Sequence, residues 1–107
     1  MDWEKFTVQV YEEMKGLCVG SLDKYKNVLS KDMQKFLEKS KCYFEQWSQQ
    51  VSEGKLTKEN YEDLVKRQMA GAEFIAIKQA GIEKIELDKL SSSIIKTVIN
   101  LAFRLLL

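Results

Sequence analysis

The chain contains no histidine and no proline, and it has few glycines and cysteines. Histidine is the commonest general base, so its absence removes the nucleophilic triads that depend on it and most zinc and di-iron sites. The lack of proline favours long uninterrupted helices, because proline breaks helix interiors. Turn residues are also too few for a β-rich fold of this length. The sequence therefore predicts an all-α protein with little support for catalysis.

Other kinds of chemistry have little support as well. The glycines of Gly16–Gly20 lack the lysine and the strand context of a phosphate-binding loop. Three carboxylates cluster in one stretch of the chain: Glu59, Glu62 and Asp63. However, Lys66 and Arg67 follow Glu62 and Asp63 at four-residue spacing, which is typical of surface ion pairs on a helix. We predict no catalytic, cofactor-binding or metal site, and we expect that the protein is not an enzyme.

The charge pattern does not indicate a nucleic-acid partner. The formal net charge is +1, whereas nucleic-acid binding usually calls for a pronounced basic excess. Lys31, Lys35 and Lys39 form a stripe of one lysine per turn that could follow phosphates, but Asp32 and Glu38 dilute it. We interpret this stripe as the solvated outer face of a long helix.

The sequence also indicates where the protein is found. It begins MDWEKFTVQV, without the basic region and apolar run of a secretory signal. No apolar stretch reaches the roughly 20 residues that a membrane-spanning helix needs. Cys18 and Cys42 lie far apart without CxxC spacing, which is typical of a reduced intracellular pair. We expect a cytoplasmic protein.

Apolar residues recur at three- and four-residue steps along four segments of the chain. This periodicity predicts helices over residues 2–16, 21–53, 57–80 and 88–106 of a single domain. Asp2 is a plausible N-cap for the first helix. The stretch Gly16–Gly20 favours a break before the second helix, although one helix running straight through it is an alternative.

The clearest turn lies around Gly54, with Thr57 as the N-cap of the following helix. So short a link forces the flanking helices to lie antiparallel. Gly81 ends the third helix, whereas residues 82–87 fit either a connector or a continuing helix. The predicted fold is an elongated antiparallel helical hairpin with a break in each arm, resembling a three- to four-helix bundle.

Small and aromatic residues predict how the arms pack. Ala72, Ala76 and Ala80 follow one another at four-residue steps, and we expect another helix to approach closely there and at Gly71. One aromatic set falls on the predicted second helix: Tyr25, Phe36, Tyr43, Phe44 and Trp47. We interpret this set as core packing, with a pocket for an apolar ligand as the alternative.

The C-terminal helix carries two adjacent apolar stripes, which leave little beyond Lys96, Thr97, Asn100 and Arg104 to face water. The hairpin brings the N-terminal helix alongside, yet one amphipathic helix covers only part of that width. We therefore predict a non-enzymatic assembly or protein-interaction module, most simply a homodimer or a binder of a partner helix. The predicted interaction surface consists of Ile94, Ile95, Val98, Ile99, Leu101 and Leu105.

A membrane surface is the alternative partner for the two ends of the chain. Both terminal helices have aromatic or aliphatic faces, and the C-terminal one ends in leucines. Interfacial helices, however, usually carry a broad face of lysine and arginine, and here that face offers Lys96 and Arg104 alone. Burial against protein is the preferred interpretation.

Overall fold

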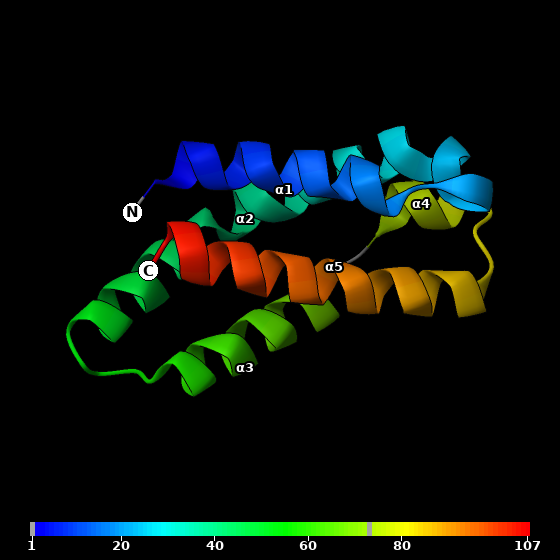
Figure 1. The fold of residues 1–107 in the computed structure, drawn as a ribbon. Coiled ribbons are helices and arrows are strands. Elements are labelled where there is room, and N and C mark those ends of the chain that lie inside the picture. The colour runs from blue at the N-terminus through cyan, green and yellow to red at the C-terminus, as the bar shows by residue number, and fades with distance from the viewer. Residues whose placement is uncertain (1, 73) are drawn as a thin grey trace.

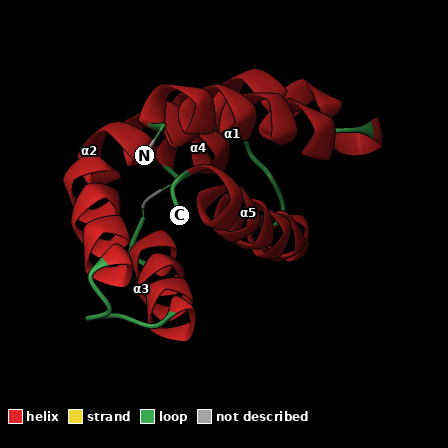
Figure 2. Ribbon diagram, turned by 60° about the vertical axis from the view of Figure 1, so that its left-hand side comes forward, coloured by secondary structure: helices red, strands yellow, loops and turns green. Residues whose placement is uncertain are grey.

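The computed structural model describes residues 2–72 and 74–107 and confirms the predicted all-α fold. The helices, in chain order, are α1 (Trp3–Leu17), the 3₁₀ helix η1 (Gly20–Tyr25), α2 (Lys26–Ser52), α3 (Lys58–Ala70), α4 (Ile75–Gln79) and α5 (Lys84–Leu105). Figure 2 shows helices and loops only over these residues. The molecule is elongated, as predicted, with principal extents of 43 × 23 × 20 Å.

The turn between α2 and α3 forms as the sequence predicts. Gly54 takes a left-handed φ of 76°, which glycine adopts without strain. The Thr57 hydroxyl accepts the backbone N–H of Asn60 at 3.1 Å, and Asn60 Oδ1 accepts the backbone N–H of Thr57 at 3.3 Å. This reciprocal cap starts α3 and sends it back along α2 at one end of the molecule (Figure 1).

The first arm contains the predicted break. Asp2 caps α1 through a hydrogen bond from the Lys5 backbone N–H to its carboxylate at 3.1 Å. Helix α1 ends at Leu17, the chain is extended at Val19, and η1 leads into α2. The second predicted helix therefore begins with a 3₁₀ segment and becomes α-helical at Lys26.

The second arm differs from the prediction in two places. The helix expected over residues 57–80 is divided into α3 and α4, and residue 73 between them lies outside the described part. Helix α3 ends at Ala70, and a Cβ on Gly71 would meet only carbonyl oxygens of α3 itself. The prediction that another helix approaches closely at Gly71 is therefore wrong. Gly81 closes α4 as predicted, but α5 begins at Lys84 rather than at residue 88.

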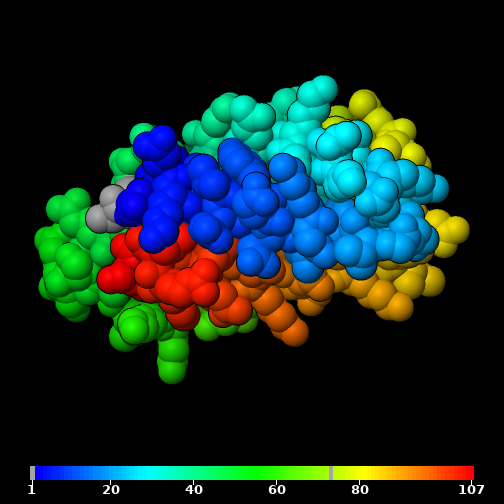
Figure 3. Space-filling model, turned by 45° about the horizontal axis from the view of Figure 1, so that its top comes forward, coloured from blue at the N-terminus to red at the C-terminus, as the bar shows by residue number. Residues whose placement is uncertain are grey.

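Helix α5 lies between two covering helices. It runs antiparallel beside α1, and the backbone N–H of Asp2 donates to the carbonyl of Leu105 at 3.5 Å (Figures 1 and 3). Helix α3 packs against α5 as well, with the Tyr61 ring 5.8 Å from that of Phe103. The hairpin thus provides α5 with a second neighbour besides α1, and both sides of its apolar surface enter the core.

A charge placed in this core should unfold the protein. Val98 is fully buried on α5, so Val98→Glu forces an unpaired carboxylate into the core and should cost about 3–5 kcal/mol of unfolding free energy or prevent folding. Urea unfolding followed by circular dichroism measures this loss. The matched control is Lys96→Glu on the exposed face of the same helix, which should change stability by no more than about 0.5 kcal/mol. Equal stability of the two variants would contradict the burial of α5.

The largest fully buried side chain belongs to Tyr61, whose hydroxyl lies 3.3 Å from the Ser48 hydroxyl on α2. Burial raises the pKa of the Tyr61 phenol above its ordinary value of 10.0, and the hydrogen bond to Ser48 offsets part of that rise. The folded state therefore holds the Tyr61 proton more tightly than the unfolded chain does. The resulting stabilisation is complete below pH 10 and is lost as the pH rises towards the folded-state pKa.

Tyr61→Phe should remove this part of the pH dependence. We expect the variant to be less stable than the wild type at pH 7, since it loses the Ser48 hydrogen bond, worth about 1 kcal/mol. The difference in unfolding free energy should shrink above pH 10, because only the wild type has the Tyr61 phenol to ionise. Urea titrations at several pH values measure it, with Tyr43→Phe on an exposed ring as control. A difference that stays constant would contradict the assignment.

Candidate binding cleft between α2, α3 and α4

The structure places most of the predicted interaction surface inside the protein. Ile94, Val98, Ile99 and Leu101 are exposed by 1%, 0%, 5% and 4% respectively. Ile95 and Leu105 are partly buried, whereas Lys96, Asn100 and Arg104 face solvent as predicted. Self-association through this surface stays a prediction, and in this fold α5 would have to leave the core to achieve it.

The described residues contain neither a metal-binding cluster nor a membrane-spanning helix. No group of histidine, cysteine, aspartate and glutamate side chains in that part of the chain is arranged to hold a metal ion. None of the described helices is both long and apolar enough to cross a bilayer. Cys18 is buried and Cys42 is exposed, and both are free thiols.

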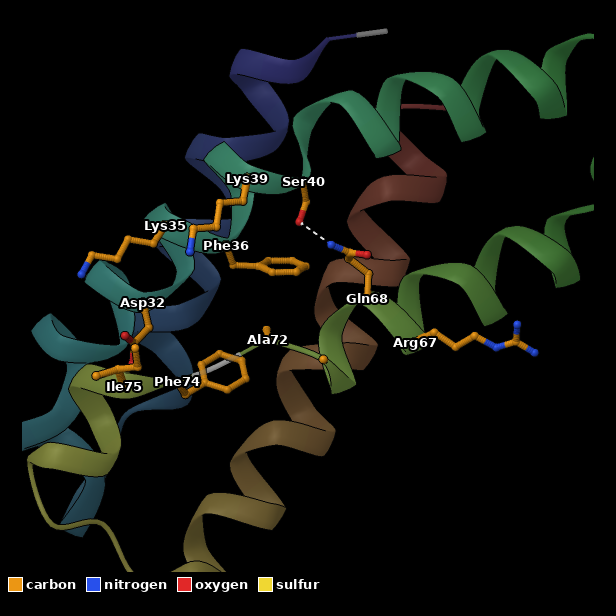
Figure 4. Close-up of a pocket in the computed structure, with 11 residues that line it drawn as sticks. Asp32, Lys35, Phe36, Lys39, Ser40, Arg67, Gln68, Ala72, Phe74 and Ile75 are labelled. Carbon is orange, nitrogen blue, oxygen red and sulfur yellow. Dashed lines mark hydrogen bonds between the residues drawn. The ribbon is translucent and has the colours of Figure 1, made fainter.

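A cleft lies between α2, the end of α3 and the start of α4. It has a volume of about 510 Å³, within the range of about 300–1,000 Å³ that ligand sites usually occupy. Helix α2 contributes Asp32, Lys35, Phe36, Lys39 and Ser40 to its lining. The second arm contributes Arg67, Gln68, Gly71, Ala72, Phe74 and Ile75 (Figure 4).

The cleft exists because α4 does not continue α3. The Asp32 carboxylate, 5% exposed, accepts the backbone N–H groups of Ala76 and Ile77, each at 3.0 Å. These groups lie in the first turn of α4, where backbone donors have no partner within the helix. Asp32 thereby holds α4 against α2. The space between α2 and the end of α3 remains open to one side.

The walls of the cleft combine apolar rings with a polar contact. Phe36 on α2 and Phe74 before α4 present their rings to the space between the two arms (Figure 4). Beside them, the Gln68 side-chain amide donates to the Ser40 hydroxyl at 3.3 Å and joins α3 to α2. The two aromatic rings thus form the floor of the cleft, and the hydrogen bond between Gln68 and Ser40 closes one edge of it.

Positive charge stands at the edges of the cleft. Lys35 and Lys39 are exposed and extend from α2 to one side, and Arg67 is exposed and extends from α3 to the other side, away from the two rings (Figure 4). No carboxylate in the described part of the chain forms an ion pair with any of the three. An acidic ligand with an apolar side chain would match such a site, with its charge at the rim and its apolar group on the rings.

The sequence provided only part of this site. The lysine stripe and the aromatic set contained Lys35, Lys39 and Phe36, but both were interpreted without the second arm. Phe44 is fully buried, in agreement with core packing, whereas Tyr43 is 49% exposed and stacks on Trp47. Arg67 and Phe74 were missed, because nothing near them in the sequence indicates that the arm turns towards α2.

Comparison with protein-family models, curated proteins and solved structures finds no match to this chain.

Asp32→Ala should loosen α4 and with it the cleft. The change leaves the buried Ile77 N–H without an acceptor and should cost about 3 kcal/mol, and Asp32→Asn should cost less because it keeps one acceptor oxygen. Hydrogen exchange of the Ala76 and Ile77 amides, measured by NMR, should accelerate in step with the loss of stability. Asp23→Ala, which removes an exposed carboxylate beside Lys26, is the control and should cost at most about 1 kcal/mol. Unchanged exchange at Ala76 and Ile77 would contradict this role.

Proposed function

We propose that the protein is a non-enzymatic interaction module that binds an acidic segment of a partner protein in the cleft between α2, α3 and α4. The observation that carries the proposal is the combination of an aromatic floor, Phe36 and Phe74, with a rim of Lys35, Lys39 and Arg67. An apolar anchor buried in such a pocket supplies most of the affinity, and rim charges supply selectivity and association rate.

The composition of the cleft favours recognition over catalysis. Its one buried carboxylate, Asp32, is occupied by two backbone N–H groups, which leaves it poorly placed to exchange a proton with a substrate. Its cations are exposed side chains on two different arms, and they suit a partner whose charges are spread over several residues. A partner segment with one aromatic or aliphatic side chain between acidic residues has this distribution.

A short peptide tests the cleft directly. The probe is an acetylated and amidated pentapeptide with phenylalanine between two pairs of glutamates, titrated into the isotopically labelled protein. We expect NMR shift changes at the amides of Phe36, Ser40, Gln68 and Gly71, with a Kd of about 0.1–1 mM. Two further pentapeptides, with lysine replacing glutamate or glycine replacing phenylalanine, should not bind.

Charge reversal at the rim separates this site from nonspecific attraction. Lys39→Glu should weaken binding of the probe about five- to tenfold, since it places a negative charge beside the glutamates. Lys96→Glu makes the same change of net charge on the exposed face of α5 and should leave the Kd within about twofold of the wild type. Binding that depends equally on both lysines, or no binding at all, would overturn the proposal.

A further inference from the structure

The side of α2 that lines the cleft continues beyond it as an exposed aromatic edge. Phe36, Lys39, Tyr43 and Trp47 follow one another at steps of three and four residues, so they lie along one side of the helix. Tyr43 is 49% exposed and stacks on Trp47, with the ring centroids 5.7 Å apart and the planes 29° from parallel. The cleft and the aromatic pair therefore belong to one continuous strip of α2.

Helix α3 borders this strip along its length. The Gln68 amide reaches Ser40 beside the cleft, and the Tyr61 ring lies 6.4 Å from the ring of Trp47 nearer the turn. Contacts from α3 thus follow the strip from the cleft to Trp47.

From this continuity, and resting on the proposed function, we infer that the partner segment is an acidic amphipathic helix lying along α2 from the cleft to the Tyr43–Trp47 pair. The distance from Phe36 to Trp47 is about 16 Å at 1.5 Å per residue, or about three turns of a bound helix. Apolar side chains on one face of that helix would contact the cleft rings at one end and Tyr43 at the other. Acidic residues on its flank would meet Lys35 and Lys39.

A helix fits this surface better than an extended peptide does. The strip presents side chains of two helices, whose backbone N–H and C=O groups are already bonded within each helix. An extended peptide would find no sheet edge here to pair with its own backbone groups, whereas a helix satisfies them internally. The four-residue spacing of Lys35, Lys39 and Tyr43 also matches the i, i+4 spacing of side chains on a facing helix.

The test uses an amphipathic probe and the fluorescence of Trp47. The probe is an acetylated and amidated peptide of about 14 residues, roughly four turns, with leucine at i, i+4, i+7 and i+11 and glutamate on both flanks. The protein carries Trp3→Phe, which leaves Trp47 as its one tryptophan. We expect a blue shift of its emission on binding and an affinity at least tenfold above that of the pentapeptide. A peptide of the same composition in scrambled order should lack both effects.

Two variants locate the far end of the bound helix. Tyr43→Ser should weaken binding of the helical probe about tenfold without changing the affinity for the pentapeptide, which does not reach it. The matched control is Val8→Ser, which alters an equally exposed apolar side chain on α1 and should change neither. Circular dichroism checks that all variants fold.

The outcomes separate this inference from the function on which it rests. If both probes bind through Lys39 but Tyr43→Ser changes nothing, the extended helix is excluded while the cleft proposal stands. If neither probe binds, both proposals fail. Stronger Lys39-dependent binding of a thymidine oligonucleotide or of phosphatidylserine vesicles would replace the peptide partner with a nucleic acid or a membrane. Concentration-dependent dimerisation that Tyr43→Ser abolishes, without probe binding, would assign the strip to a second copy of the chain.

Discussion

Asp32 joins parts of the chain that lie 44 residues apart, because its carboxylate accepts a backbone N–H from Ala76. Helix α4 has five residues, too few to be stable alone, so its position depends on this bond, on its counterpart at Ile77 and on the burial of the Ile77 side chain. With α4 held against α2, the second arm turns where α3 ends. As a result Phe36 and Phe74, which are 7% and 8% exposed, line the cleft.

The same arrangement explains why the apolar face of α5, the most apolar helix, is largely buried. The width of the two stripes on α5 exceeds what α1 alone could cover, which is why the sequence indicated self-association. The turn at Gly54 brings α3 to α5 as well, and four of the six residues of the predicted interaction surface are then buried. Each buried aliphatic side chain is worth roughly 1.5–3 kcal/mol, so releasing α5 towards a second chain would cost much of the stability of the domain.

The features that could be predicted are those decided within three or four residues. The Asp2 and Thr57 caps, the turn at Gly54 and the end of α4 at Gly81 all depend on neighbours in the chain. The start of α4 could not be predicted, because the carboxylate that accepts its first backbone N–H groups lies on another helix. The lysines of α2 lie in solvent, as expected. Their proximity to Phe74 could not be predicted, since it depends on the path of the whole second arm.

The binding proposed for the cleft and for the strip beyond it relies on two kinds of interaction. Charges at the rim act over a Debye length of about 8 Å at physiological ionic strength, so they speed the approach of an acidic partner and weaken as salt rises. Aromatic contacts at Phe36, Phe74 and Tyr43 act only on contact and depend little on salt. A partner that satisfies both should therefore retain its apolar contacts in high salt but associate more slowly. A purely acidic polymer, without side chains for the rings, would lose most of its binding under the same conditions.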